Sequence, residues 1–378
     1  MSGRWHRLYY GKTTVNFYGQ RKVAFIASAI ALLITIVSLI FQGLEMGIDF
    51  KGGVSWEAPV AGQLNTEKAR EILGENEIEA NSAKIQILTA GDSQRIRIQI
   101  GETEETTRIT IQQQIAEAAG VEVVEVSVAD VSSSWGRSIT EKAVRALVIF
   151  LIAATIFISW RFEWKMAVSA IASMLHDVIL SVGVYSLFQF EVTPATVVAF
   201  LTILGFSLYD TIVVFDSIKE NERKLSGAKV AYGDIINVSM NEVLMRSVNT
   251  TISTLLPIAS LLVVGAWIMG AVTLREFAVA LLVGLGFGTY SSIYVAAPMV
   301  GVLKSREMQY RAQGHNVATG DDMALLITTG TASKRRKASR AADSSDTLEA
   351  VAKVTDSQSA PVETLLSHPP RPRKKSRR

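Results

Sequence analysis

Long apolar stretches alternate with short charged segments along most of this chain. A helix that crosses a membrane needs roughly 20 mostly apolar residues to traverse a hydrocarbon core ~30 Å thick. Six stretches meet this criterion: residues 23–41, 144–160, 166–188, 194–216, 247–268 and 276–300. A long polar segment separates the first from the other five. The pattern predicts a polytopic α-helical membrane protein with six transmembrane helices in a 1+5 arrangement.

The first apolar stretch follows a basic leader, residues 1–22, as the core of a signal peptide would. It is too long for a typical signal core, however, and no A-x-A cleavage pattern follows it. We therefore expect residues 23–43 to form an uncleaved membrane anchor.

Residues 44–142 have a different pattern, typical of a small globular domain. VSWEAPV and VEVVEVSV are strand-like, and AKIQILTA and SQRIRIQI alternate around the turn Gly91-Asp92 as a hairpin does. Two helices are expected between the strands, one capped by Asn65 and one by Thr103. The order β-α-β-β-α-β is that of a split βαβ unit. The sequence thus predicts a small α+β ferredoxin-like domain between the first and second transmembrane helices.

The distribution of Lys and Arg predicts the side of the membrane on which each segment lies. These residues gather in the leader, in the links between spans 2 and 3 and between spans 4 and 5, and in residues 304–378. Arg275, between spans 5 and 6, is the exception. Because cytoplasmic loops carry such an excess, both termini are predicted to be cytoplasmic. The acidic domain at 44–142 is then extracytoplasmic, and residues 143–303 form a five-helix membrane domain.

The segment 304–378 is rich in Ser, Ala, Lys and Arg and poor in aromatic residues. Such a composition predicts a disordered tail. Its basic runs, SKRRKASR and RPRKKSRR, fit contact with anionic lipid or with ribosomal RNA. The alternative interpretation is a tail that only adds positive charge and solubility.

Composition supports the membrane class and narrows the chemistry. Hydrophobic residues make up 49% of the 378 residues and charged residues only 19%, against about 25% charged in an average soluble domain. The chain has no Cys, which excludes a disulfide framework, a thiolate nucleophile and a Cys-ligated metal site. The four His residues are scattered. We therefore expect no metal, no cofactor and no enzymatic reaction.

Polar residues inside the third predicted span recur every four residues and form one ridge. They are Ser169, Ser173, Asp177, Ser181 and Tyr185. A lipid-facing carboxylate would cost at least ~2.5 kcal/mol on insertion scales. Asp177 is therefore expected to face other helices.

The fourth span carries Asp210, and the fifth carries Arg246 near its cytoplasmic end. At about 1.5 Å per residue, Asp210 falls in the cytoplasmic half of the hydrocarbon core, near the depth of Arg246. An Arg–Asp ion pair is the expected way to hold both charges there. Asp216, further along the same helix, is expected at the membrane boundary with a structural role.

Two interpretations of Asp177, Asp210 and Arg246 stay open. In the first, they form a polar network that only fixes helix packing. In the second, the network takes up and releases protons, and the helices rearrange as its charge changes. Ionisable residues inside membranes are functional by default, yet desolvation and a neighbouring Arg shift the proton affinity of an Asp in opposite directions.

The sixth span contains a ridge of small residues, Gly284, Gly288 and Ser292, which would let another helix approach closely. It is interpreted as a packing surface.

GIDFKGG, residues 47–53, directly follows the first span. Gly52 and Gly53 would allow a tight exit from the span into the first strand. Asp49 is expected to cap or hydrogen-bond this turn, next to Phe50. The motif is interpreted as structural, with contact to a substrate as the alternative.

Five ordered motifs carry a resemblance to a known family. They are GIDFKGG, RFEWKMAVSAIASMLHDV, GFSLYDTIVVFDSIKEN, SMNEVLMRSVNTTISTLLP and LREFAVALLVGLGFGTYSSIYVAAP. Together with the 1+5 layout, they resemble the SecF side of the SecD/SecF family of protein-export membrane proteins, within the resistance–nodulation–division superfamily. The resemblance covers roughly residues 20–305.

The resemblance implies an accessory subunit of the Sec translocase in the bacterial cytoplasmic membrane. Such a subunit pairs with SecD and works beside the SecYEG channel on unfolded polypeptides that SecA has pushed. It uses the proton-motive force to promote their translocation. By motif, Asp210 and Arg246 match residues implicated in proton flow, Asp177 matches the HD position, and a further acid would come from SecD. The sequence departs from the pattern at Tyr209, where Asn is expected.

Two other functions stay open. One is a proton-coupled exporter of small molecules or lipids from the same superfamily, and the other is a passive scaffold that stabilises the channel. The single small domain argues against the exporter, since such exporters usually have twelve spans and two large domains. The scaffold differs from the leading hypothesis in needing no proton transfer.

Overall fold

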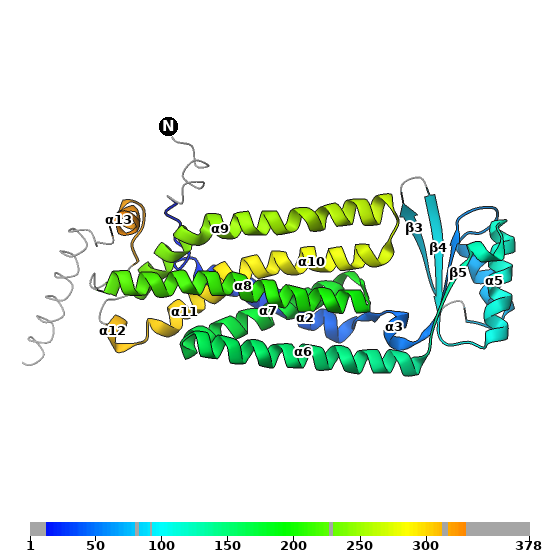
Figure 1. The fold of residues 1–378 in the computed structure, drawn as a ribbon, viewed down its shortest axis with the longest axis horizontal. Helices are drawn as coiled ribbons and strands as arrows, with labels where there is room; N and C mark the ends of the chain where they lie inside the picture. Colours follow the sequence, from blue (N-terminus) through cyan, green and yellow to red (C-terminus); the bar gives the residue numbers. More distant parts are fainter. Residues whose placement is uncertain (1–12, 80–82, 91–92, 227–229, 312–316, 330–378) are drawn as a thin grey trace, which may run out of the picture.

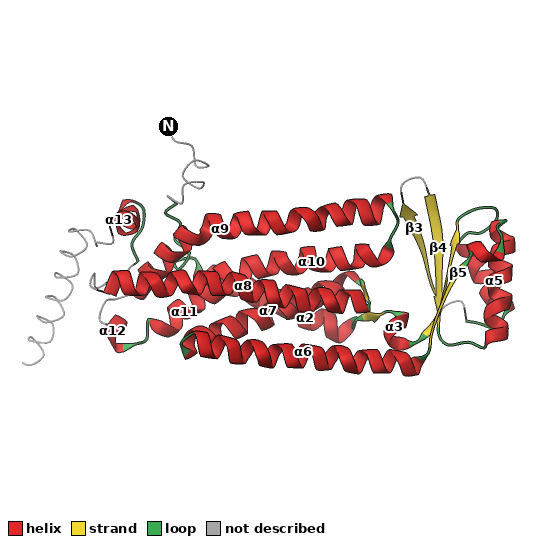
Figure 2. Ribbon diagram, in the orientation of Figure 1, coloured by secondary structure: helices red, strands yellow, loops and turns green. Residues whose placement is uncertain are grey.

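A computed structural model of the chain describes residues 13–79, 83–90, 93–226, 230–311 and 317–329. Long helices lie side by side in a bundle, and a small domain of helices and strands lies at one end of it (Figure 1). Strands are gathered in this small domain, whereas the bundle is almost entirely helical (Figure 2).

Six helical segments of the described chain are long and apolar enough to cross a membrane. They are α2 (Arg21–Phe41), α6 (Ser133–Arg161), α7 (Trp164–Phe188), α8 (Pro194–Leu225), α9 (Tyr232–Leu261) with the π-helix η3 (Leu262–Ile268), and α10 (Val272–Ser291) with the π-helix η4 (Ser292–Ala296) and α11 (Ala297–Lys304). The six predicted apolar stretches are confirmed. Most helices run further than the apolar residues do, because backbone hydrogen bonding continues through polar residues outside the hydrocarbon core.

The small domain has the element order β2 (Gly53–Pro59), α4 (Thr66–Glu75), β3 (Lys84–Ala90), β4 (Ser93–Ile100), α5 (Glu105–Ala119), the short η1 (Val123–Glu125) and β5 (Ser127–Val131). The strands form an antiparallel sheet in the order β3-β4-β2-β5. Its buried core includes Trp56, Ile98 and Ile111. The Asn65 side chain caps α4 by accepting from the Lys68 N–H at 2.8 Å, as predicted. Glu104, not Thr103, is the N-cap of α5.

Helix α6 begins ten residues earlier than the predicted membrane domain, at Ser133 rather than residue 143. The Ser132 hydroxyl caps it by accepting from the Trp135 N–H at 3.3 Å. A serine cap of this kind satisfies one of the free N–H groups at a helix start. The helix therefore begins beside the sheet and carries the chain from the small domain into the bundle.

The motif GIDFKGG forms a short helix, α3 (Ile48–Lys51), and its glycines make a close turn into β2. Gly52 has φ +81°, and a Cβ there would lie 2.7 Å from Ser133 Cα; Gly53 has φ +138° and lies against the Ile100 carbonyl. Only glycine adopts both the conformation and the close approach without strain. Phe50 is buried against the bundle. The predicted capping role of Asp49 is wrong, since Gly47 is the N-cap of α3.

Part of the predicted disordered tail is ordered. The tail includes α12 (Met308–Arg311) and α13 (Asp321–Thr329), and α13 packs on the bundle through buried Met323 and Leu326. The Ala318 N–H donates to Asp234 Oδ1 at 2.6 Å, which ties this segment to the start of α9. The short apolar run MALLIT supplies the side chains that are buried. The polar composition of the whole tail did not indicate them. Both basic runs lie outside the described residues.

The leader is also held by α9. The Tyr18 N–H donates to Asn237 Oδ1 at 2.8 Å, and the Val15 N–H donates to Asn241 Oδ1 at 2.9 Å. Two asparagines one turn apart thus bind the backbone of this segment, which forms a turn at residues 17–20. Both ends of the described chain meet at this end of the bundle.

Candidate intramembrane charge site

Asp177 lies in the middle of the bundle with no exposed surface. Its Oδ2 atom accepts hydrogen bonds from Ser207 Oγ on α8 at 2.5 Å and from Ser291 Oγ at the end of α10 at 2.6 Å. His176 Nδ1 lies 3.1 Å from its Oδ1 atom. The side chain therefore faces other helices, and three polar groups satisfy it.

Asp210 lies on α8 one turn beyond Ser207. Its Oδ1 atom accepts from Ser247 Oγ of α9 at 2.9 Å, and its Oδ2 atom accepts from the Ser292 hydroxyl. One turn of α8 thus carries both Ser207, whose hydroxyl binds Asp177, and Asp210, whose carboxylate binds Ser247 and Ser292.

The two aspartates are joined through adjacent serines. Ser291 ends α10 and Ser292 begins the π-helix η4. Single turns of π-helix are rare and often occur at functional sites, because they change the direction of neighbouring side chains. Here the change lets two consecutive hydroxyls bind carboxylates on two different helices, so the site runs continuously from α7 through α10 to α8 and α9.

The glycine ridge of α10 allows this approach. Gly284 lies against Ile203 of α8, and a Cβ at Gly288 would lie 3.4 Å from Ser207 Cβ and 3.8 Å from Asp177 Oδ2. Small residues let helix backbones come close in a membrane. Ser292, assigned to packing by the sequence, also donates a hydrogen bond to Asp210.

The predicted ion pair between Asp210 and Arg246 is wrong for this structure. Arg246 is exposed and makes no ion pair or hydrogen bond with the part of the chain that the structure describes. Successive residues of an α-helix point about 100° apart. Ser247 faces Asp210, so its neighbour Arg246 faces away from it. The sequence therefore predicted the correct turn of α9 beside Asp210, but it selected Arg246 where Ser247 makes the contact.

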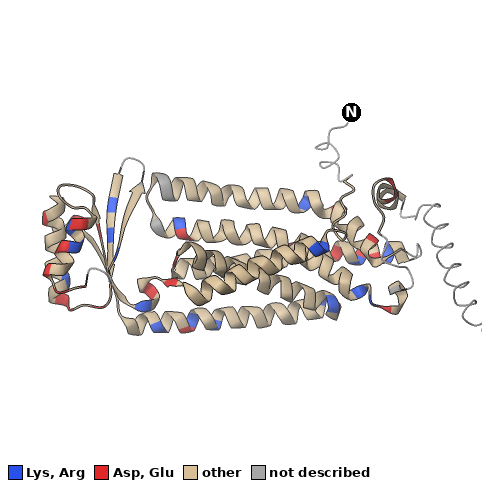
Figure 3. Ribbon diagram, turned by 180° about the vertical axis from the view of Figure 1, so that it is seen from behind, with Lys and Arg blue, Asp and Glu red and all other residues tan. Residues whose placement is uncertain are grey.

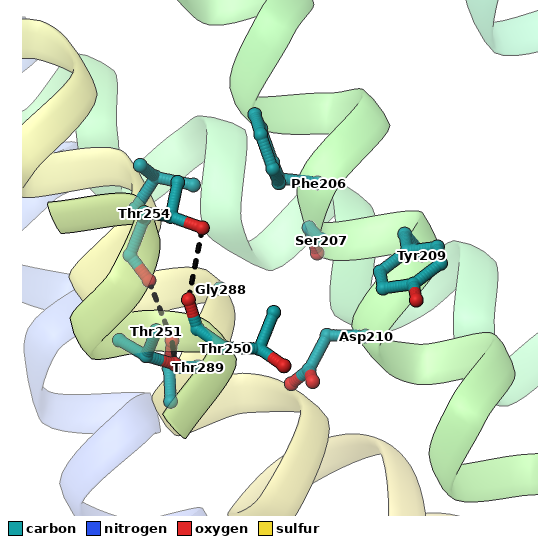
Figure 4. A pocket seen from close by; sticks show the side chains of 10 residues that line it. Phe206, Ser207, Tyr209, Asp210, Thr250, Thr251, Thr254, Gly288 and Thr289 are labelled. Carbon is teal, nitrogen blue, oxygen red and sulfur yellow. Dashed lines mark hydrogen bonds between the residues drawn. The ribbon is translucent and has the colours of Figure 1, made fainter. Parts of the chain in front are cut away.

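Asp210 lies at a hollow between α8, α9 and α10. Phe206, Tyr209, Thr250, Thr251, Thr254, Leu285, Gly288 and Thr289 also line it. In Figure 4 the carboxylate points from α8 toward the hydroxyl-bearing turns of the other two helices. Thr251 Oγ1 and Thr289 Oγ1 lie 3.0 Å apart across the hollow. The wall is therefore rich in groups that both donate and accept hydrogen bonds.

Other charges lie toward the ends of the bundle and in the small domain (Figure 3). Asp216 pairs with Arg161 at 3.0 Å, and both side chains are about half exposed. This geometry fits the structural role that the sequence suggests for Asp216. Among the described residues, no three His, Asp or Glu side chains are grouped so as to hold a metal ion.

The family model described as protein export membrane protein SecD/SecF, C-terminal, matches residues 111–306. The protein translocase subunit SecF of Streptomyces coelicolor is 38% identical over 307 residues, 81% of each chain. This chain belongs to the SecD/SecF family. The SecF subunit of Mycobacterium tuberculosis is 36% identical over 308 residues, 79% of this chain and 69% of that one.

Two solved structures of SecDF share the family fold. SecDF from Thermus thermophilus, a translocon-associated membrane protein, gives a TM-score of 0.70 at 31% identity. A super-membrane-facing form of SecDF gives 0.57 at 30% identity. Each alignment covers 78% of this chain and 39% of the solved chain, so this chain spans about two fifths of SecDF.

Sequence reasoning missed Ser291, Ser247 and the contact of His176 with Asp177. The first two each stand directly beside a residue that the sequence did select, Ser292 and Arg246. The available signal was therefore the presence of two adjacent polar residues on a helix. One member of such a pair faces a given neighbouring helix and the other does not.

Proposed function

We propose that this chain is an accessory subunit of the Sec translocase in the bacterial cytoplasmic membrane. With SecD, it would use the proton-motive force to promote translocation of unfolded polypeptides through SecYEG, after SecA has pushed them. The observation that carries the proposal is the pair of membrane-embedded carboxylates, Asp177 and Asp210, joined by adjacent serines of α10 and η4. The names of the relatives favour this function over a small-molecule exporter.

The hydroxyl partners suit a group that gains and loses a proton. Each serine donates to an ionised carboxylate, and after protonation the same hydroxyl can rotate and accept from the carboxylic acid. The cluster can therefore change charge without leaving a buried polar group unpaired, which would cost about 1–3 kcal/mol. Protonation of Asp210 would weaken the bonds that hold α8, α9 and η4 together and let these helices shift.

A second membrane subunit is needed to cover Asp210. The hollow is bordered by Phe206 and Tyr209 of α8, both of which are exposed. Arg246 is exposed on α9 too. Lipid contact with a carboxylate and a guanidinium is costly, so a polar surface of a partner fits better here. The remaining length of SecDF is the natural source of that surface, and we assign it to SecD, with Arg246 pairing an acid of that partner.

We also infer the membrane topology. The sheet order β3-β4-β2-β5 is that of a ferredoxin-like domain, inserted after the first of six spans. Arg161 and Lys165 mark one bundle end, together with exposed Trp160 and Trp164. Trp marks either membrane interface, whereas an excess of Lys and Arg marks the cytoplasmic one. The described ends of the chain are held at the start of α9, at this end, so we place both termini in the cytoplasm and the domain outside, with the boundaries 1–22, 23–43, 44–132 and 133–303.

The site is connected mechanically to the extracytoplasmic domain. Glu191 lies in β6 (Glu191–Val192), the short strand between α7 and α8, which pairs with β1 (Glu45–Met46). Lys84 Nζ of β3 donates to Glu191 Oε2 at 3.1 Å, and Gln99 Nε2 of β4 donates to Glu191 Oε1 at 3.2 Å. The helices that carry both aspartates thus meet the domain at one carboxylate, so a tilt of these helices would move the domain.

This connection predicts that a locked domain stops the coupled step. The chain has no Cys, so Lys84→Cys with Glu191→Cys gives one reactive pair for a short, reducible thiol cross-linker. We expect cross-linking to abolish gradient-dependent export and reduction to restore it. Lys68→Cys with Glu71→Cys, whose parent side chains pair at 3.0 Å within α4, is the control that ties nothing to the bundle. Full export by the locked protein would contradict domain movement.

Asp49 lies near this connection, and its surroundings predict that the stability of the protein depends on pH. Burial, and then the negative charge of Glu191, raise the pKa of Asp49, although Arg97 opposes them. The folded state then binds the proton more tightly than the unfolded state, so Asp49 lowers stability as pH rises through these pKa values. We expect Asp49→Asn to raise the apparent melting temperature at pH 7 and to have no effect below about pH 3, where the carboxyl is mostly neutral in both states. A lower melting temperature at pH 7 would contradict this.

Gradient-dependent export in inverted membrane vesicles tests the proposed function. Asp177→Asn and Asp210→Asn each keep the size of the side chain and remove its charge. Both variants should assemble with SecD, and both should lose the response to the gradient.

A further inference from the structure

His176 is a buried imidazole next to Asp177 on α7, with 6% of its surface exposed. Its Nδ1 atom lies 3.1 Å from Asp177 Oδ1, whereas the two serines bind Oδ2. An ionised carboxylate only accepts hydrogen bonds, so Nδ1 carries the proton in this contact. The other ring nitrogen, Nε2, is then an acceptor when the ring is neutral.

Nε2 is in an unusual position for a buried polar atom. It has no hydrogen-bond partner among the described residues, and the same holds for Ser173 Oγ, one turn earlier on α7. Buried polar groups are nearly always paired in proteins. Two such atoms at i and i+3 lie on one side of the helix. They mark a polar spot where a proton-bearing water can bind between Ser173 and His176.

The side chain of Tyr290 lies beside the imidazole and contacts α2. The Tyr290 ring lies 6.5 Å from the His176 ring, and its hydroxyl donates to the Ala24 carbonyl of α2 at 3.2 Å and lies 3.3 Å from Ser28 Oγ.

Charged groups are remote from this side. Helix α2 has none between residues 23 and 41, and α7 has only Asp177 beyond Lys165. Helix α8 contributes Asp210, which lies behind the serines, and η4 adds only the phenol of Tyr294. Hydroxyl groups therefore line the approach to Nε2.

We propose that His176 is a proton-transfer residue that exchanges protons with Asp177 from the α2 side, entirely within this chain. A water-borne proton binds Nε2, and the proton on Nδ1 passes to Asp177 Oδ1. The ring ends neutral with its proton on Nε2, and the carboxylate ends as a carboxylic acid. The reverse transfer restores the starting state. The inference rests on the proton-driven function proposed above and gives that function a route that does not cross the SecD interface.

The test uses the complex of this chain with SecD in sealed proteoliposomes that contain a pH indicator. In His176→Asn, the amide still donates to Asp177 but no second nitrogen accepts a proton. We expect the rate of proton uptake under an imposed gradient to fall at least about a hundredfold, at the low end of what a positioned proton-transfer group contributes. Ser186→Ala is the matched control, because Ser186 is a buried α7 hydroxyl that binds Ser38 at 2.8 Å, away from Asp177. It should keep the wild-type rate.

A second measurement does not depend on the folding of His176→Asn. The infrared band of the Asp177 carboxyl group is identified in the wild-type complex by its absence in Asp177→Asn. The inference predicts that this band and an imidazole band change together as pH is varied. A carboxyl band that titrates with no imidazole change, or wild-type proton uptake by an assembled His176→Asn complex, overturns the role of His176. If Asp177→Asn and Asp210→Asn themselves take up protons normally, the proposed function fails instead.

Discussion

Replacing Asp210 with Asn is expected to abolish the gradient-dependent part of export and to leave the part driven by ATP. The amide has nearly the volume of the carboxyl group. Its oxygen can still accept from one of Ser247 and Ser292, and its NH2 group can donate to the hydroxyl oxygen of the other. It cannot take up or release a proton, so the bonds between α8, α9 and η4 would stay in one state. The loss should be at least about a hundredfold in the gradient-dependent rate, the smaller end of the effect of removing a proton-transfer group.

The measurement is translocation of a secreted protein into inverted membrane vesicles, with and without a proton gradient. Asp216→Asn is the matched control, because Asp216 lies on the same helix but pairs with Arg161 at 3.0 Å near the surface. Unchanged gradient-dependent export by Asp210→Asn would exclude the proton role. Failure of that variant to assemble with SecD would instead favour a packing role for the network.

Local pattern predicted the helices and strands but not the contacts between them. Six apolar stretches were long enough to define six helices, and alternation located β2, β3 and β4. The predicted strand VEVVEVSV is wrong for most of its length, because it includes the turn η1, and β5 begins only at Ser127. The polar ridge of α7 correctly predicted that Asp177 faces inward. The two arguments for this, the four-residue spacing and the cost of a lipid-facing carboxylate, both concern a single helix. Contacts between helices depend on rotation about each axis. An error of one residue turns a side chain about 100°, and for this reason the sequence chose Arg246 where Ser247 faces Asp210.

The π-helix at Ser292 had no signature in the sequence. The stretch GTYSSIYVAAP reads as ordinary apolar helix with small residues, so only Ser292 stood out, as a packing residue. Change of direction within a helix comes from the tertiary contacts on both sides, here the two carboxylates and the tight approach at Gly284 and Gly288. The tail shows the same limit, since MALLIT is too short to stand out against a basic, Ser-rich background.

Lys304 should be the residue at the α11 end of the bundle whose loss destabilises the chain most. Its side chain is 2% exposed, and Nζ lies 2.7 Å from Glu163 Oε2 and 2.8 Å from Glu222 Oε2. The Tyr310 hydroxyl of α12 also donates to Glu222, at 3.1 Å. One ammonium group therefore links the start of α7, the end of α8, the end of α11 and the ordered part of the tail.

We expect Lys304→Met to destabilise the protein by roughly 3–5 kcal/mol, because it leaves the mostly buried Glu222 carboxylate without its cation. The measurement is the apparent melting temperature of the purified complex, together with proteolysis after α11. The matched control is Lys224→Met, since Lys224 pairs with Glu220 at 2.8 Å with both side chains more than half exposed. An exposed pair contributes about 0–1 kcal/mol. Equal melting temperatures for the two variants would show that the buried charges are not what holds this end of the bundle together.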